Sequence, residues 1–325
     1  MSQIDRREFL DKSAKGAAIG LAATSLTAPF VQAQGANDRI VVGVMGLSRG
    51  RSLAVGFAKQ PNVDVKYVCD TDSTRASSCV QLVEGAGGKT PQAIGDFRRI
   101  LDDKEVDLLV CAAPNHWHAP ATIMACNAGK HVYVEKPCSH NPWEGETMVA
   151  AAREHKRCVQ MGSQRRSGDG LQRAIQELHE GVIGKVYLTK AWYFSVRGSL
   201  GMGKKADPPK DLDYDLWQGP APRTQYMDNR VHYNWHWFWQ WGNGELGNNG
   251  IHTLDICRWG LGVDYPVRVT SSGGRYRYDD DQETPDTHTV CYEFDNGSAA
   301  VWEGTSCNRH GSGFVTFYGE DGAMD

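Results

Sequence analysis

Four apolar, β-branched runs in the first half of the chain alternate with segments that can form helices. The runs cover residues 40–45, 63–69, 106–112 and 131–135. Continuous apolar runs of this length are typical of strands buried on both faces, as in parallel sheets. Their alternation with helices predicts an α/β fold with a doubly wound parallel sheet, which binds its ligands at the carboxyl ends of the strands.

The first two strand ends carry residues suited to a dinucleotide. A glycine turn with Gly46, Ser48, Arg49 and Gly50 follows the first run, and Asp70 ends the second. An acid about 20 residues beyond such a turn typically holds a ribose hydroxyl, and its charge would repel a 2′-phosphate, so NAD is favoured over NADP. Ser48 replaces the second glycine of the usual G-x-G-x-x-G pattern, so the turn alone is weak evidence. Arg49 could close over the phosphates or could be a solvated turn residue.

The third strand end leads into a polar and aromatic segment, residues 114–120, which we expect to be a loop before a helix at 121–128. Its Pro114, Asn115 and His118 would face the same crevice as the glycine turn. His118 could contact the cofactor or the substrate, or it could be a capping or core histidine.

The fourth strand delivers Glu135 and Lys136 to its carboxyl end and is stopped by Pro137, which lacks a backbone donor. A solvated Lys–Pro turn is the plain alternative. Because the strand ends at Gly46, Pro114 and Lys136 face one crevice, we predict that the Glu135 and Lys136 side chains line the cofactor site.

The second half of the chain has a different pattern. Alternating apolar and polar residues recur in five runs, at 185–193, 267–272, 288–294, 299–302 and 313–318. Such alternation is typical of antiparallel strands with one open face. We therefore predict a nucleotide-binding domain at residues 35–160 and a second α/β domain with a large open, mainly antiparallel sheet at 161–325.

A long irregular segment, residues 198–244, interrupts these strands, and loops of this length are usually functional. Residues expected to bind substrate lie in or around it, and they can bond hydroxyl groups or stack on a sugar ring: Arg165, Arg166, Tyr193, Trp235, His236 and Asp255. Packing roles for the aromatic rings and surface ion pairs for the arginines are the alternatives.

Asn248, His252 and Asp255 recur at helical spacing, so a helix beginning near Asn248 would show all three on one face. A histidine can act as a general base near neutral pH, although a lone helical histidine is usually structural. Together with Lys136 at a strand end facing a cofactor, His252 is a candidate catalytic residue.

Composition excludes several classes of function. The formal net charge of −4 offers no basic face for nucleic acid. The nine cysteines show neither C-x-x-C pairs nor zinc-finger spacing, so we expect reduced thiols. No metal site is predicted, because the pairs His116/His118 and His232/His236 lack partners with ligand geometry.

Residues 1–34 read as a targeting segment. Arg6 and Arg7 precede an Ala-rich, uncharged run that ends near a small-residue cleavage site at 31–33. This predicts a twin-arginine signal peptide, export of the folded protein and a periplasmic location. A transmembrane anchor is less suited, because the run is short and is interrupted by Pro29.

Taken together, these motifs resemble the Gfo/Idh/MocA oxidoreductase family, which includes glucose-fructose oxidoreductase and inositol dehydrogenase. The resemblance rests on residues 44–50, 114–118, 129–137, 215–222 and 244–255. It implies an N-terminal Rossmann domain that holds NAD or NADP and a C-terminal domain whose open sheet forms dimers or tetramers. It also implies that relatives continue beyond residues 317–322, so the last strands are expected to be missing here.

Carried over to this chain, Lys136 looks like the family lysine that binds the reacting hydroxyl, and His252 looks like the acid/base histidine. Asn248 stands where the family often has an aspartate, and an amide cannot take a proton. The expected function is oxidation of a sugar or polyol hydroxyl with tightly bound NAD. There are two alternatives: a redox-neutral glycoside hydrolase or lyase, and a sugar-binding protein without catalytic activity.

Overall fold

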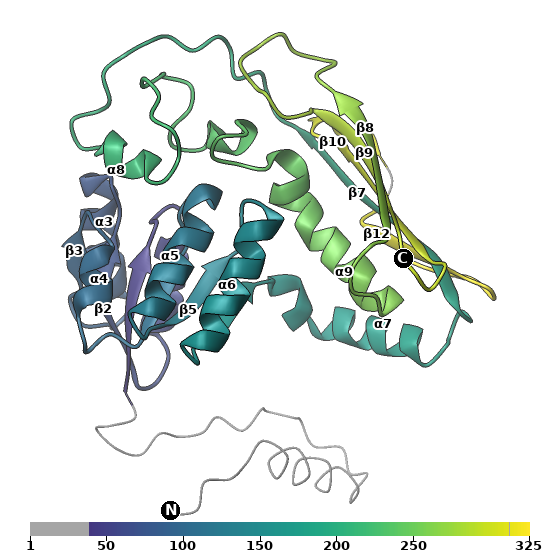
Figure 1. Cartoon of the computed structure of the whole chain (residues 1–325), viewed down its shortest axis with the longest axis horizontal. Helices are drawn as coiled ribbons and strands as arrows, with labels where there is room; N and C mark the ends of the chain where they lie inside the picture. Colours follow the sequence, from purple (N-terminus) through teal and green to yellow (C-terminus); the bar gives the residue numbers. More distant parts are fainter. Residues whose placement is uncertain (1–38, 312) are drawn as a thin grey trace, which may run out of the picture. The chain divides into compact units, whose positions relative to one another are not determined.

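The computed structural model describes residues 39–325 with the exception of residue 312, so the predicted signal segment lies outside the described residues (Figure 1). Within that part, no helix is both long and apolar enough to span a membrane. The chain forms two sheets in succession, which confirms the predicted α/β fold class.

The first sheet has six parallel strands in the order β3-β2-β1-β4-β5-β6. Its strands are β1 (Ile40–Met45), β2 (Val63–Cys69), β3 (Gln92–Ile94), β4 (Leu108–Cys111), β5 (His131–Glu135) and β6 (Val159–Gly162). The helices that connect them are α2 (Gly50–Ala58), α3 (Ser73–Gly85), α4 (Arg98–Asp102), α5 (Asn115–Asn127) and α6 (Pro142–Glu154). This is the predicted doubly wound sheet.

Strand β1 shows why an uninterrupted apolar run becomes a central strand. Its side chains alternate between the two faces of the sheet, and both faces are covered. Val42 and Val44 pack in the cluster formed with α2 and α3, whereas Val41 and Met45 pack in the cluster formed with α4, α5 and α6. Both layers of helices are therefore held by one strand.

The segment 114–120 is not a loop, and this prediction was wrong. Helix α5 already begins at Asn115, after Pro114, and it contains Pro120. Proline removes one backbone hydrogen bond near the amino end of the helix, but the following residues Ala121 and Ala125 are fully buried against the sheet. Tertiary packing thus produces a helix where the polar and aromatic composition predicted a loop.

The second sheet has the order β13-β12-β7-β10-β9-β8, and β11 pairs with β7 off this path. Its strands are β7 (Val186–Val196), β8 (Arg268–Gly274), β9 (Thr287–Glu293), β10 (Ala299–Thr305), β11 (Cys307–Asn308), β12 (Val315–Gly319) and β13 (Ala323–Met324). All pairs are antiparallel except β7 with β10, so the sheet is mixed. All five predicted runs form strands here.

Helices α7 (Asp169–His179) and α9 (Ile251–Leu261) lie on one side of this sheet in Figure 1. Helix α9 contacts β7, β10 and β12. The helix predicted to begin near Asn248 starts differently, because residues Leu246–Gly250 form a π-helical turn ahead of α9. Such turns occur frequently at functional sites.

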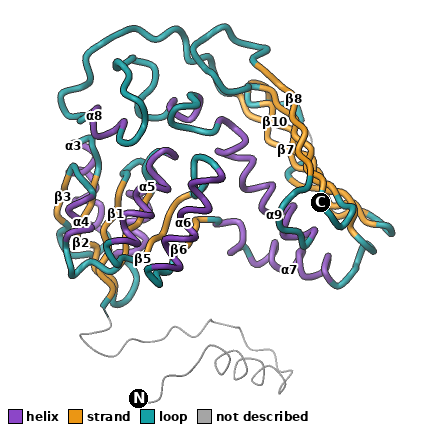
Figure 2. Tube along the Cα trace, viewed as in Figure 1, coloured by secondary structure: helices purple, strands orange, loops and turns teal. Residues whose placement is uncertain are grey.

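The irregular segment 198–244, here called the crossing segment, runs from β7 back over the carboxyl ends of the first sheet (Figure 2). It contains helix α8 (Tyr214–Gln218) and a 3₁₀ turn at Asn234–Trp237. Six of its residues form an apolar cluster of their own: Leu212, Tyr214, Trp217, Trp235, Phe238 and Trp241. Most of its rings are therefore packing residues.

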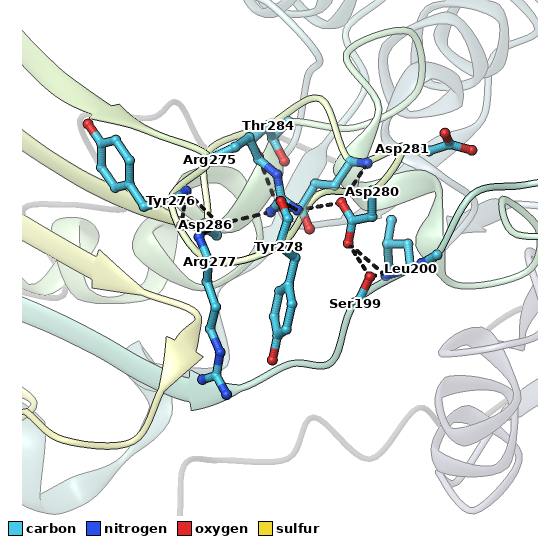
Figure 3. A network of polar contacts seen from close by, with 12 residues as sticks. Ser199, Leu200, Arg275, Tyr276, Arg277, Tyr278, Asp280, Asp281, Thr284 and Asp286 are labelled. Carbon is cyan, nitrogen blue, oxygen red and sulfur yellow. Dashed lines mark hydrogen bonds and ion pairs between the residues drawn. The ribbon is translucent and has the colours of Figure 1, made fainter.

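A polar network ties the start of the crossing segment to the connection between β8 and β9 (Figure 3). The Asp280 carboxylate accepts hydrogen bonds from the Ser199 hydroxyl at 2.8 Å and from the Leu200 backbone at 2.9 Å. Arg275 pairs with Asp280 and with Asp286, whose oxygen lies 3.2 Å away. The segment is thus anchored where it leaves the second sheet.

Candidate active site

A cavity of about 370 Å³ opens where the carboxyl ends of β1, β2, β4 and β5 meet the crossing segment and the π-helical turn. This is within the usual range for small-molecule sites. Its lining brings together predicted residues from distant parts of the chain: Gly46, Ser48, Arg49, Asp70, Pro114, Asn115, His118, Glu135, Lys136, Trp235, His236, Asn248 and His252.

Gly46 begins the turn after β1 and has a φ of +84°. A Cβ atom at this position would lie 2.5 Å from the Ala113 backbone nitrogen, so the turn packs directly against the end of β4. Glycine is therefore needed both for the backbone conformation and for the close approach. The turn and the end of β4 together form one wall of the cavity.

Asp70 lies at the carboxyl end of β2. Its side chain accepts hydrogen bonds from the backbone N–H of Leu47 at 2.7 Å and of Asp72 at 2.9 Å. Burial raises the pKa of Asp70, and these two hydrogen bonds oppose the shift. The carboxylate is thus held rigidly beside the glycine turn, as a ribose hydroxyl acceptor would need to be.

Arg49 does not stand free in the turn. Its Nε donates to Glu135 Oε1 at 3.2 Å, and Gln164 donates to the same oxygen at 3.0 Å. The guanidinium group remains half exposed at the cavity wall. The ion pair joins the turn after β1 to the end of β5.

Lys136 follows the last residue of β5 and reaches across to the π-helical turn. Its Nζ donates to the backbone oxygen of Asn248 at 2.7 Å and to the Asn248 side-chain oxygen at 3.1 Å. Burial lowers the pKa of Lys136, while Glu135 and Glu245 oppose the shift. The ammonium group is thus positioned by the residue that replaces the expected aspartate.

His252 lies in the first turn of α9 and lines the same cavity. Burial lowers its pKa, and the positive charges of Lys136 and Arg165 lower it further. The imidazole is therefore neutral near pH 7 and able to accept a proton.

His118 is fully buried in α5, although one edge of it reaches the cavity lining. Its Nδ1 lies 2.5 Å from the Pro137 backbone oxygen and its Nε2 lies 2.7 Å from that of Ala113. Burial lowers its pKa. A neutral imidazole has one N–H, so His118 donates to one of these two carbonyl oxygens, and it packs between the end of β4 and the Pro137 backbone next to Lys136.

Trp235 and His236 form the wall contributed by the crossing segment. Their rings stack with centroids 3.6 Å apart at an interplanar angle of 20°. Burial lowers the pKa of His236 to about 4, so this ring is neutral at ordinary pH. The wall presents an apolar face with a polar edge.

Five residues predicted for the site do not line the cavity. Gly50 begins α2, and Tyr193 accepts a hydrogen bond from Arg197 at 3.2 Å. Arg166 and Asp255 bind each other through two hydrogen bonds of 2.8 Å. The fifth, Arg165, lies over the ring of Phe314.

The cavity also has lining and neighbouring residues that were not predicted as cofactor-binding, substrate-binding or catalytic residues. Trp117, Gln164 and His232 line the cavity. Glu245 and Arg197 form an ion pair just behind it, at 2.6 Å. Glu245 stands inside the 244–255 motif, but its partner lies 48 positions away, which no local pattern indicates.

Among the described residues, no group of three or more His, Cys, Asp or Glu side chains is arranged to hold a metal ion. All nine cysteines are free thiols, in agreement with the reduced thiols expected from the sequence. Cys69 and Cys111 are buried, and Cys291 is half-buried.

Both halves of the chain match models of known protein families. The model described as oxidoreductase family, NAD-binding Rossmann fold, matches residues 39–163. The model described as oxidoreductase family, C-terminal alpha/beta domain, matches residues 182–322. Neither range tests the predicted boundary between residues 160 and 161, which stays a prediction.

Curated relatives carry two kinds of name. A "Glycosyl hydrolase family 109 protein" of Saccharopolyspora erythraea is 29% identical over 253 residues, covering 69% of this chain and 55% of that protein. A levoglucosan dehydrogenase of Pseudarthrobacter phenanthrenivorans is 26% identical over 251 residues, covering 70% of this chain and 57% of that protein. The match therefore spans little more than half the length of these relatives.

Solved structures share the fold. A levoglucosan dehydrogenase in complex with NADH aligns with a TM-score of 0.68 at 19% identity, covering 88% of this chain and 72% of that chain. The WlbA dehydrogenase from Chromobacterium violaceum, in complex with NADH and UDP-GlcNAcA, aligns with a TM-score of 0.68 at 20% identity, covering 89% and 74%. At this identity the likeness concerns the fold alone.

Proposed function

The chain belongs to the Gfo/Idh/MocA family of oxidoreductases, whose N-terminal domain is an NAD-binding Rossmann domain, and on this basis we propose that it oxidises a hydroxyl group of a sugar, polyol or glycoside. One observation carries the proposal. Lys136, Asn248 and His252 line the same cavity as the glycine turn and Asp70. A proton acceptor and a hydroxyl-binding ammonium group thus stand beside a dinucleotide site.

NAD fits the residues present. The turn at Gly46 lets the backbone approach a pyrophosphate at the amino end of α2, where backbone N–H groups favour anions. The Asp70 carboxylate can accept from ribose hydroxyls and would repel a 2′-phosphate, which favours NAD over NADP. When bound, the nicotinamide supplies the hydride acceptor.

The protein side chains would bind the reacting hydroxyl and remove its proton. Lys136 donates a hydrogen bond to the reacting oxygen and stabilises the negative charge that develops on it. His252, neutral near pH 7, takes the hydroxyl proton on its free ring nitrogen. Asn248 cannot take a proton and holds Lys136 in place through its two oxygens.

The substrate class follows from the wall opposite the strand ends. The Trp235 and His236 rings present a flat apolar surface for a sugar face, and His236 offers a neutral ring nitrogen to its hydroxyls. One relative is named levoglucosan dehydrogenase, and that name fits a carbohydrate substrate here.

A redox-neutral glycoside hydrolase or lyase is the second candidate, because a relative at 29% identity is named a glycosyl hydrolase family 109 protein. Transient oxidation of a ring carbon acidifies the neighbouring C–H bond and permits elimination, after which the hydride returns. The same Lys136 and His252 would serve both reactions.

We also propose that the cofactor is tightly held, since the crossing segment is fastened over the end of β2. The Ser73 N–H donates to Asp211 O at 2.9 Å, and the Asp213 N–H donates to Thr71 O at 2.9 Å. His232 Nε2 lies 3.1 Å from Asp72 Oδ2. We expect these contacts to slow the release of a bound dinucleotide.

Location and assembly remain part of the proposal. The twin-arginine pattern of residues 1–34 supports export of the folded protein to the periplasm, where free dinucleotide is scarce. Exposed apolar residues at and before β8, including Val267 and Val269, support a dimer or tetramer formed through the open sheet.

The test is turnover by the purified holoprotein with a panel of sugars, polyols and nitrophenyl glycosides. Reduction of bound NAD by one of them supports the oxidoreductase, whereas nitrophenol release without added oxidant supports the redox-neutral enzyme. Calorimetric sugar binding with neither reaction would refute both and leave a binding protein.

A further inference from the structure

A partly buried ion pair, Arg197 with Glu245, lies next to residues of the cavity wall without lining the cavity itself. Arg197, from the residue after β7, donates from Nε to Glu245 Oε2 at 2.6 Å and from Nη2 to Oε1 at 3.3 Å. The Glu245 side chain is only 4% exposed. Removing these charges from water costs desolvation energy, so we looked for a function that the ion pair could serve in the site.

The surroundings hold this pair rigidly. The Arg197 guanidinium lies 4.7 Å from the centroid of the Trp237 ring and donates to the hydroxyl groups of Tyr193 and Tyr233, at 3.2 Å and 3.1 Å. These bonds leave the guanidinium in one orientation. The carboxylate of Glu245 is therefore fixed relative to the π-helical turn.

Glu245 in turn organises the two asparagines of that turn. Its Oε1 accepts hydrogen bonds from the side-chain amides of Asn249 and Asn248, the latter at 3.5 Å. A carboxylate accepts hydrogen bonds and does not donate them, so it selects the amide orientation with the nitrogen of Asn248 toward it. The amide oxygen of Asn248 then faces Lys136, which donates to it at 3.1 Å.

We infer that the Arg197–Glu245 pair is a positioning device for the proposed reaction: it sets the orientation of the Asn248 amide and thereby the place of the Lys136 ammonium group. This inference rests on the proposed function, because it assigns to Lys136 the reacting hydroxyl. Glu245 and Arg197 touch neither cofactor nor substrate and act only through Asn248.

The pair also contributes to the charge around Lys136. The groups that face Lys136 are Glu135 and Arg49 from the first sheet, Glu245 and His252 from the π-helical turn and α9, and Arg197 and His236 from β7 and the crossing segment. Glu135 and Glu245 are the negative charges among them. Loss of the Glu245 charge leaves Arg197 unpaired and favours the neutral form of Lys136.

The test compares Glu245→Gln with a matched control, Glu177→Gln, which removes the same charge from an exposed ion pair with Arg173 on α7. The pH dependence of acetylation of Lys136 by acetic anhydride, followed by mass spectrometry of the NAD-bound protein, measures the ammonium group without any substrate. In Glu245→Gln we expect the midpoint of labelling to move to lower pH, and in Glu177→Gln we expect it to stay.

Kinetics on the best substrate give the second measurement. We expect kcat of Glu245→Gln to fall roughly tenfold to a hundredfold with little change in KM, because misplacement of a reacting group weakens the transition state more than substrate binding. In an Asn248→Leu background the same substitution should have no further effect on kcat, because the amide that transmits it is gone.

Unchanged labelling of Lys136 and equal kcat in Glu245→Gln and Glu177→Gln would overturn the inference, as would additive effects of Glu245→Gln and Asn248→Leu. If Glu245→Gln does not fold, Glu245→Asp keeps the charge but withdraws it by one methylene. It should lower kcat while leaving the labelling midpoint in place, and a wild-type kcat would refute the positioning role. Wild-type protein that oxidises no sugar would refute the proposed function, whereas the labelling of Lys136 would still show whether the Glu245 charge acts on its ammonium group.

Discussion

Replacement of Lys136 by methionine separates a reacting lysine from a structural one. Methionine keeps most of the length of the side chain and removes the ammonium group, which is held by two hydrogen bonds to Asn248. If Lys136 binds the reacting oxygen, activity should fall far more than stability. If the lysine only braces the π-helical turn, the reverse should hold.

The stability terms oppose each other. Loss of hydrogen bonds from a charged donor costs roughly 1.5–3 kcal/mol, and relief of a partly buried charge returns an amount of the same order, several kcal/mol at most. The net change should therefore stay within about 1–2 kcal/mol, or about 4–8 °C in Tm at the upper limit. Loss of the charge at the reacting oxygen should lower kcat about 10²–10⁴-fold, which corresponds to roughly 3–5 kcal/mol.

The pH dependence of stability gives an independent prediction for Lys136→Met. The pKa of Lys136 is lowered from 10.5 in the folded protein, chiefly by burial. Below the folded pKa both the folded and the unfolded chain carry the proton, so the cost of burying the charge is fully present. As the pH rises from the folded pKa toward 10.5, the folded protein releases the proton first and the cost disappears. Any stabilisation of Lys136→Met should thus be largest near neutral pH and fade in alkali.

Thermal melting from pH 6 to pH 10 and single-turnover reduction of bound NAD measure both quantities on the same samples. A fall in Tm well beyond the stated range combined with retained hydride transfer would refute the assigned role of Lys136. Retained NAD binding in the variant is the control for an intact site.

Three further predictions follow from single contacts. Gly46→Ala should lower Tm and should also reduce the rise in Tm on adding NAD, because the new Cβ would lie 2.5 Å from the Ala113 nitrogen. The φ of +84° adds strain of about 1–2 kcal/mol. An unchanged NAD-induced rise in Tm would contradict this prediction. His252→Asn should lower kcat/KM about 10²–10⁴-fold and abolish the acidic limb of the pH profile. In the wild type this limb should lie below the ordinary histidine pKa of 6.5, because burial lowers the pKa of His252. An acidic limb that survives in the variant would mean that another group titrates there. His232→Leu should speed the loss of NAD on dialysis, since it removes the 3.1 Å contact to Asp72, and a wild-type dissociation rate would argue against a retaining role for the crossing segment.

The fold was largely predictable because its signals are local. The run at residues 40–45 can be buried on both faces only in a covered sheet, and Val42 and Val44 are indeed fully buried. Strand-end residues such as Asp70 and Lys136 could be placed together because parallel strands bring their carboxyl ends to one edge.

What the sequence did not reveal depends on contacts between distant residues. The polar and aromatic composition of residues 114–120 suggested a loop, but packing of α5 against the sheet decided for a helix. Arg166 and Asp255 were each assigned to substrate, and the fold pairs them with each other across 89 positions. The role of Glu245 depends on Arg197, which follows β7 and lies 48 positions away in the sequence, so no local pattern indicates the pair.

We expect a sugar hydroxyl to reduce an NAD that is held over the strand ends beside Lys136 and His252. Mass spectrometry of the dinucleotide released by denaturing the native protein, after exposure to the sugar panel, tests it most directly. We predict about one dinucleotide per chain, converted to NADH by at least one sugar in the wild type and remaining NAD in Lys136→Met. Protein that releases no dinucleotide, or equal conversion in both proteins, would contradict the account.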